Sequence, residues 1–146
     1  MNLKKIKARD LMTEIVISIP QDTLIKDAAH LMLRDRISGL LVINTKKRIV
    51  GIITLTDFLS IIDHLTRADN DDFLANLLRC RTLKVSDVMT KNICTITPET
   101  SLRDVIKTMV KKNIHTFPIM KGNKLLGILG RRDIINAVFA IADDGK

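Results

Sequence analysis

Aromatic residues and cysteines are both scarce in this chain of 146 residues. Aromatics make up 3% of the sequence, with no Trp and no Tyr, so the core must be built from Ile, Leu, Val and Met. Cysteine occurs as Cys80 and Cys94, which show no pairing pattern. Two unpaired thiols are typical of a reducing compartment. We therefore expect a cytoplasmic protein.

Long hydrophobic runs are missing as well. The longest, around residues 134–142, is interrupted by Asn136 and falls short of the roughly 18 residues of a membrane-spanning helix. The basic residues at the amino terminus are not followed by the apolar stretch of a secretory signal. A hydrophobic content of 46% and a charged content of 27% are typical of a soluble globular domain. The sequence thus predicts one soluble domain without a membrane segment.

Motifs of enzymes and metal sites are also missing. His30, His64 and His115 are dispersed and do not have the spacing of a metal site. Nothing resembles a nucleophile elbow, a Cys–His signature, a Walker loop or a Gly-x-Gly-x-x-Gly loop. Cys94, in a predicted strand without a cation beside it, is expected to be a small buried apolar residue. We predict no catalytic residues and no metal, so not an enzyme.

The net charge of +8 could indicate a nucleic-acid surface. Acidic residues, however, are interleaved with Lys and Arg, and no stacking aromatic lies among the basic residues. This distribution favours a solvated surface with a positive bias, which would also attract small anions such as nucleotides. Nucleic-acid binding is therefore not favoured.

What the chain does contain is a repeat. The segment Asp10-Leu11-Met12-Thr13 returns as Asp87-Val88-Met89-Thr90, and residues 51–57 return as residues 127–133. From Asp10 onward, at an offset of 77, and of 76 after a one-residue deletion, eleven positions are identical: Asp10, Met12, Thr13, Ile19, Thr23, Asp27, Met32, Ile37, Gly51, Ile52 and Asp57. Two copies favour a paired module with a pseudo-twofold axis over a solenoid. Two related surfaces that meet at such an axis create a cleft, where we expect the functional site.

Hydrophobic spacing predicts the same elements in each copy. In repeat one, residues 15–19, 40–43 and 49–53 have the apolar pattern of strands. The first helix is expected to be capped by Asp22 or Thr23 and broken at Ser38-Gly39. The second helix is expected to be capped by Thr54 or Thr56, and its predicted buried side is Phe58, Leu59, Ile62 and Leu65.

Repeat two predicts strands over residues 94–96, 117–120 and 125–129, and helices over residues 101–112 and 132–142. Between the repeats, residues 67–72 are charged and the apolar residues after them suggest an extra helical turn or two. The predicted fold class is α/β (α+β): two β-α-β-β-α motifs, residues 9–66 and 85–142, with sheets packed against helices. A connector over residues 67–84 joins them into a single module spanning residues 1–146.

A unit that opens on Asp-(Leu/Val)-Met-Thr and closes on Gly-Ile-(Ile/Leu)-x-x-x-Asp resembles a CBS domain, the cystathionine-β-synthase-type motif. Two in tandem resemble a CBS pair, or Bateman module, over nearly the whole chain. The resemblance implies a regulatory sensor that binds an adenosine-containing ligand such as AMP, ADP, ATP or S-adenosylmethionine. It implies no obligatory cofactor, and pairing of modules into a flat four-motif disk. Because no second domain is attached, it implies a free-standing sensor with an unknown regulated partner.

Asp57 is the central candidate in repeat one. A carboxylate at the start of a helix can accept hydrogen bonds from two neighbouring ribose hydroxyls. Thr54, at the preceding turn, could meet a phosphate with its hydroxyl and nearby backbone N–H groups. The alternative is that Thr54 or Thr56 caps the helix and Asp57 complements the helix dipole.

Repeat two departs from this pattern, since Gly130 replaces the hydroxyl residue. Arg131 and Arg132 follow and could bind a phosphate bidentately, while Asp133 keeps the ribose role. His115 matches a position from which members of the family often reach a phosphate; its alternative is a surface histidine. Repeat one has the uncharged residues 38–41 there. We therefore expect two unequal sites, the second better suited to a phosphorylated ligand.

The adenine is expected between the first strand of a repeat and its hairpin, with apolar walls and backbone groups at its edge. The predicted ligand-binding residues are Ser18, Ile19, Gly39, Leu40, Thr54, Asp57, Thr95, Ile96, His115, Thr116, Phe117, Pro118, Arg131, Arg132 and Asp133.

The last helix is apolar on almost every face, and such a helix must be buried on all sides. This predicts a homodimer through that helix and its repeat-one counterpart, with Leu59, Ile61 and Ile62. The leading hypothesis is a regulatory adenosine-binding module that signals to a partner protein. The main alternative is a structural or protein-interaction dimer that has lost ligand binding, with Gly130 and Leu41 as signs of that loss.

Overall fold

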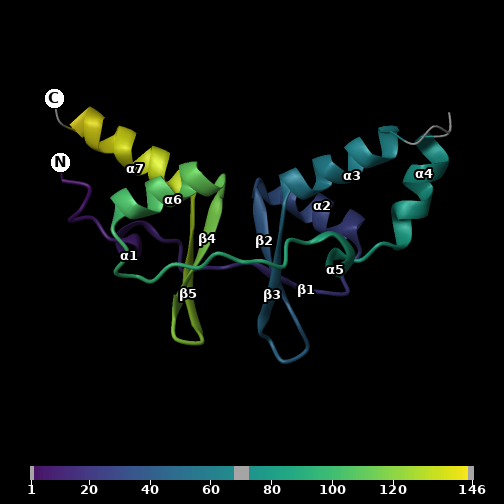
Figure 1. The fold of residues 1–146 in the computed structure, drawn as a ribbon, viewed down its shortest axis with the longest axis horizontal. Coiled ribbons are helices and arrows are strands. Elements are labelled where there is room, and N and C mark those ends of the chain that lie inside the picture. The colour runs from purple at the N-terminus through teal and green to yellow at the C-terminus, as the bar shows by residue number, and fades with distance from the viewer. Residues whose placement is uncertain (1, 68–72, 145–146) are drawn as a thin grey trace. The chain divides into compact units, whose positions relative to one another are not determined.

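A computed structural model describes residues 2–67 and 73–144 and shows mixed helices and strands (Figure 1). The chain folds into two compact units, one of residues 17–93 and one of residues 1–16 together with 94–146. The predicted α+β class is confirmed. Each unit holds the hairpin of one repeat and the opening segment of the other.

The unit of residues 17–93 is built on a three-stranded sheet in the order β1-β2-β3. β1 (Ser18–Pro20) runs parallel to β2 (Gly39–Ile43), which forms an antiparallel hairpin with β3 (Ile49–Thr54). Helices α2 (Ile25–Asp35) and α3 (Leu55–Arg67) belong to the same unit. Its core is Ile19, Ile25, Ala28, Met32, Leu40, Val42, Ile53 and Val85. Aliphatic side chains and one methionine thus form this core, as the composition predicted.

The second unit contains the hairpin of β4 (Thr116–Lys121) and β5 (Lys124–Gly130). Helices α6 (Leu102–Lys112) and α7 (Arg131–Asp144) accompany it, with α1 (Ala8–Leu11) from the amino-terminal segment. Its core is Ala8, Leu102, Val105, Phe117, Ile119, Leu129 and Ile134. Among the described residues, Phe117 is the one fully buried aromatic side chain, and Phe58 packs partly buried against the core of the first unit.

The opening of each repeat packs in the unit that holds the other repeat's hairpin. Ala8 of α1 lies in the core of the second unit, and its repeat equivalent Val85, from α5 (Val85–Val88), lies in the core of the first. Figure 1 shows α1 under α6, and α5 beside β3. Matching hydrogen bonds hold the two openings: Ala8 N–H donates to the Thr100 carbonyl at 2.8 Å, and Val85 N–H to the Thr23 carbonyl at 2.7 Å.

Each opening then adds one residue pair to the hairpin it meets. Thr90 and Ile52 exchange two backbone hydrogen bonds of 2.9 Å, and Thr13 and Ile128 exchange bonds of 2.9 and 3.0 Å. The methionine before each threonine lies against a glycine of the same strand. A Cβ on Gly51 would stand 2.3 Å from Sδ of Met89, so this contact depends on a residue without a side chain. The glycine, isoleucine, methionine and threonine that are identical in the two repeats therefore lie together where each opening meets a hairpin.

Two predicted strands differ from the structure. Residues 15–19 shift to Ser18–Pro20, because Ile15 and Ile17 lie where the chain passes between the units and are 84% and 40% exposed. Residues 94–96 form no strand; Ile96 makes a single parallel bridge to Ile119. The hairpins occur where predicted, because their apolar runs are long enough to pair along their full length.

Of the predicted caps, those of α2 are wrong, and of the two candidates for α3 it is Thr54 that stands directly before the helix. Ser101, which was predicted as the first residue of its helix, is instead the cap of α6 and accepts a hydrogen bond from Asp104 N–H at 3.2 Å. Asp22 and Thr23 do not cap α2, whose capping position is Leu24, because the chain there pairs with the segment before α5 through a Leu24–Lys84 bridge. Thr56 lies inside the first turn of α3 and so does not cap it.

The connector contains the predicted extra helix, as α4 (Phe73–Arg79) followed by the 3-10 turn η1 (Cys80–Thr82). Most of the predicted charged stretch, residues 68–72, lies outside the described residues. Phe73, Leu74, Leu77 and Leu78 of the connector are 44–63% exposed. No helix within the described ranges is long and apolar enough to cross a membrane.

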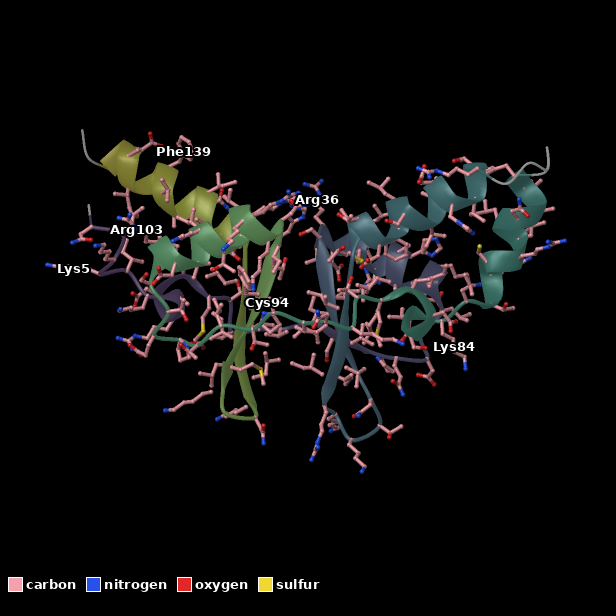
Figure 2. All side chains as sticks on the ribbon, in the orientation of Figure 1. Lys5, Arg36, Lys84, Cys94, Arg103 and Phe139 are labelled. Atoms are coloured by element: carbon pink, nitrogen blue, oxygen red, sulfur yellow. The ribbon has the colours of Figure 1, made fainter. Side chains whose placement is uncertain are left out.

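The buried sides of α3 and α7 are narrower than predicted. On α3, Phe58 and Ile61 pack against the core, whereas Leu59 and Ile62 are 65% and 45% exposed. On α7, Ile134 is buried and Phe139, labelled in Figure 2, is 66% exposed. A short hairpin offers each helix one face to cover, so the opposite apolar side chains stay at the surface.

Candidate functional site

The first candidate site is the turn where β3 ends and α3 begins. Thr54 is the last residue of β3, and Asp57 stands in the first turn of α3. Oδ2 of Asp57 accepts hydrogen bonds from the Thr54 backbone N–H at 2.7 Å and from the Thr54 hydroxyl at 3.2 Å. The carboxylate thereby satisfies a backbone donor at the helix start and complements the helix dipole.

Two further segments complete this turn. The Ser38 carbonyl accepts a hydrogen bond from Leu55 N–H at 3.2 Å, and Gly39 lies opposite Thr54 in the hairpin. The Thr90 hydroxyl, from the opening of repeat two, donates to Oδ1 of Asp57 at 3.2 Å. We call Ser38, Gly39, Thr54, Asp57 and Thr90 the first corner.

The remaining predicted residues of repeat one have different surroundings. Ile19 and Leu40 are 6% and 0% exposed, so their side chains belong to the core. Ser18 is exposed and pairs with Leu41 at the start of β1. The structure therefore brings Gly39, Thr54 and Asp57 together, while the side chains of Ile19 and Leu40 support the sheet beneath them.

The second candidate site repeats the same turn between β5 and α7. Gly130 N–H donates to Oδ2 of Asp133 at 2.7 Å, and Arg131 N–H donates to the His115 carbonyl at 2.9 Å. Thr116 lies opposite Gly130 in the hairpin, as Gly39 lies opposite Thr54. We call His115, Thr116, Gly130, Arg131 and Asp133 the second corner.

The side chains of the second corner differ in exposure. His115 and Asp133 are half-buried, and Nε2 of His115 lies 3.3 Å from Oδ1 of Asn113. Arg131 and Arg132 are exposed at the start of α7. A Cβ on Gly130 would lie 3.4 Å from Oδ2 of Asp133, which is an ordinary contact distance. Steric crowding therefore does not explain why position 130 lacks a hydroxyl side chain.

The other predicted residues of repeat two lie along β4. Phe117 and Pro118 are fully buried, so their side chains are closed to a ligand. Ile96 N–H donates to the Pro118 carbonyl at 3.1 Å, and Met120 N–H donates to the Ile96 carbonyl at 2.9 Å. Thr95, the residue before, is exposed.

Asp57 also borders a hollow of about 320 Å³ beside α3. Its lining is Asp57, Ser60, Ile61, His64, Leu65, Cys80, Leu83 and Val88. The sequence did not single out Ser60 or Leu83, because nothing in the helical pattern shows that the connector returns alongside α3. A mostly apolar wall with a few polar groups is the usual composition of a small-molecule pocket.

One ion pair at the end of α2 perturbs the pKa values of its two members. The hydrogen bond that Arg34 donates to Asp35, at 3.0 Å, lowers the pKa of the exposed Asp35 carboxyl and raises that of the guanidinium. Among the described residues, no group of three His, Cys, Asp or Glu side chains could hold a metal ion. The chemistry that the corners offer is hydrogen bonding by a carboxylate, with cationic side chains next to the second one.

Thr90 was not predicted as a site residue. Its identity with Thr13 was visible in the repeat, but the sequence places it 33 residues from Asp57 and in the other copy. The contact arises because the openings are exchanged between the two units. No local pattern indicates such an exchange.

Comparison with known proteins agrees with the repeat and with the fold. The CBS domain matches residues 8–64 and 85–140, more than half of the chain. An uncharacterized protein of Methanocaldococcus jannaschii is 30% identical, and the match covers 89% of both chains. A homoserine O-acetyltransferase of Methanosphaera stadtmanae is 32% identical, but this chain spans only 24% of that enzyme's length.

Solved structures show the same architecture. An uncharacterized conserved protein from Pyrococcus horikoshii has a TM-score of 0.75 at 25% identity, covering 94% of this chain and 95% of its own. A protein named CBSX2, solved in complex with AMP, has a TM-score of 0.74 at 23% identity, covering 94% and 98%. Two matched CBS domains, each with its hairpin and helical corner, show that this chain belongs to the CBS domain family.

Proposed function

We propose that this chain is a regulatory module that binds an adenosine-containing ligand at its two corners and transmits the bound state to a partner protein. Candidate ligands are AMP, ADP, ATP and S-adenosylmethionine. The family supports a regulatory role, and the AMP complex of one structural relative supports this ligand class. Two free cysteines fit a reducing cytoplasm. The proposed role is binding and not catalysis.

The observation that carries the proposal is the carboxylate of the second corner. Oδ2 of Asp133 is held by Gly130 N–H, and Oδ1 has no hydrogen-bond partner within the described part of the chain. A half-buried carboxylate fixed by one oxygen can offer the other to a ribose diol without rearrangement. Arg131 at the same helix start, and the helix dipole itself, favour a phosphate nearby.

The test is calorimetric titration of the chain with AMP, ATP and S-adenosylmethionine, compared with the variant Asp133→Asn. Asparagine still offers Gly130 N–H an oxygen, so the helix start is kept, but it loses the charge. Hydrogen bonds to charged groups contribute about 1.5–3 kcal/mol, so we expect affinity at this corner to fall roughly 10- to 100-fold. If none of the three ligands binds the unaltered chain with a Kd below about 1 mM, adenosine binding is refuted.

Asp87→Asn is the matched control. Asp87 also stands in the first turn of a short helix and accepts a hydrogen bond from Lys84 N–H at 2.8 Å, but it belongs to neither corner. We expect the substitution to leave ligand affinity unchanged. An equal loss of affinity in both variants would mean that helix capping, and not ribose binding, explains the result.

A second candidate function is assembly through α7. Ile135 and Phe139 are 52% and 66% exposed on this helix, and Leu59 is 65% exposed on α3. Exposed aliphatic and aromatic side chains on one helix favour a partner surface. We propose a homodimer, and we expect Phe139→Asp to reduce the mass measured by light scattering to that of a monomer. A monomeric mass for the unaltered chain at micromolar concentration would refute the homodimer.

A further inference from the structure

The Asp57–Thr90 hydrogen bond has no counterpart at the second corner. The backbones match, since Thr90 pairs with Ile52 as Thr13 pairs with Ile128. The side chains do not: the Thr90 hydroxyl donates to Oδ1 of Asp57, whereas within the described residues the Thr13 hydroxyl makes no hydrogen bond to Asp133. This is a difference between two sites whose backbones are otherwise alike.

The number of acceptor positions on each carboxylate shows what this difference means. An ionised carboxylate has about four lone-pair positions. Asp57 uses three of them, for Thr54 N–H, the Thr54 hydroxyl and the Thr90 hydroxyl. Asp133 uses one, for Gly130 N–H. A ribose diol donates two hydrogen bonds, so Asp133 can accept both while Asp57 must release one present partner.

Thr90 is the partner that Asp57 can release at least cost. Thr54 N–H is a backbone donor at the helix start and, at 2.7 Å, forms the shortest of the three bonds. The Thr90 hydroxyl is bound at 3.2 Å, lies on an exposed side chain and can rotate to water. The Thr90 backbone would stay in place, since it is paired with β3 by two hydrogen bonds of 2.9 Å.

We propose that Thr90 closes the first corner against ligand, and that ribose binding at Asp57 requires its hydroxyl to turn away. This rests on the proposed function and adds to it a residue from the other repeat. The first corner is then the weaker site because the Thr90 hydroxyl and the ribose compete for Oδ1 of Asp57. A ligand there also frees the side chain of Thr90, five residues before Thr95 in the predicted second site.

The affinity test uses AMP on the Asp133→Asn background, in which binding at the second corner is weakened. Adding Thr90→Val removes the competing hydroxyl and keeps the side-chain shape, so we expect AMP to bind the first corner about three- to tenfold more tightly. Thr13→Val in the otherwise unaltered chain is the matched control and should leave the affinity of the second corner unchanged. Unchanged or weaker AMP binding after Thr90→Val, or a first corner that binds no AMP in either background, refutes the gating role.

A ligand-free measurement separates this inference from the proposed function. We expect Thr90→Val to lower the urea midpoint of the unaltered chain, and to lower it less when Asp57→Ala is already present, because the hydrogen bond is then gone. Thr13→Val should shift the midpoint equally with and without Asp133→Ala. Equal shifts for Thr90→Val in both backgrounds would refute the hydrogen bond itself. If these single and double substitutions shift the midpoint as expected but no adenosine-containing ligand binds, the proposed function fails while the Asp57–Thr90 pair stands.

Discussion

The contact between Gly51 and Met89 provides a sharp test of how the two repeats interlock. A Cβ on Gly51 would stand 2.3 Å from Sδ and 2.8 Å from Cγ of Met89, distances that real Cβ atoms do not show. Gly51→Ala should therefore force Met89 out of its place against β3. Overpacking costs typically about 1–3 kcal/mol, and replacing a strand glycine offsets it by about 0.5–1 kcal/mol. We expect a net loss of about 1–2 kcal/mol in the free energy of unfolding.

The partner substitution Met89→Ala tests whether the clash with Met89 causes this loss. In the Met89→Ala background the clash is gone, so Gly51→Ala should cost nothing or stabilise slightly. Gly127→Ala is the comparison, because its Cβ would stand 2.8 Å from the Thr13 carbonyl oxygen, which is backbone, as well as 3.0 Å from Sδ of Met12. Shortening Met12 to alanine removes only the side-chain clash, so Gly127→Ala should remain destabilising there.

Urea unfolding followed by circular dichroism measures all six variants: two glycine, two methionine and two double substitutions. The midpoint of Gly51→Ala/Met89→Ala should lie at or above that of Met89→Ala alone. If Gly51→Ala costs as much with alanine at position 89 as with methionine, the two residues are not in contact and the interlock is wrong.

Three further predictions concern the helix ends. Ser101→Ala should lower the free energy of unfolding by about 1 kcal/mol, because Ser101 caps α6, whereas Thr23→Ala should cost less than half of that; urea midpoints compare them. Gly130→Thr should raise that free energy by about 0.5–1 kcal/mol, since the added hydroxyl can donate to Asp133 as that of Thr54 does to Asp57. The hydrogen bond from Arg34 lowers the pKa of Asp35 in the folded state. The stabilising effect of this pair is therefore present above the unfolded pKa of about 3.9 and is lost as pH falls through the folded value. Arg34→Ala should raise the Asp35 pKa in an NMR titration, and an unchanged value would contradict the pairing.

Much of the fold could be predicted because it depends on local spacing. Apolar runs separated by polar turns are sufficient to define both hairpins, and helical spacing defines α2, α3, α6 and α7. The short first strands could not be placed, because they have few partners and their ends depend on where the chain crosses between the units. Ile15 illustrates this, since its β-branched side chain predicts a strand but is 84% exposed.

The candidate site was predictable to the extent that it is a local turn. Thr54 and Asp57 lie three residues apart, and so do Gly130 and Asp133, so their hydrogen bonds follow from a strand that runs directly into a helix. The burial of Leu40 and Phe117 was not predictable, because an apolar residue beside a polar turn can face either the core or a ligand.

The sequence by itself determined the two repeats, the hairpins and the two helix-start carboxylates, because each of these depends on residues close together in the chain. The tertiary structure alone decided which partner each repeated residue meets. Met12 and Met89 are the same residue of the repeat, as are Gly51 and Gly127, so the pattern allows either methionine to face either glycine. In the structure each methionine contacts the glycine of the other repeat: Met89 lies on Gly51, and Met12 lies on Gly127. That exchange also places Thr90 on Asp57, because backbone pairing with β3 fixes the residue next to Met89.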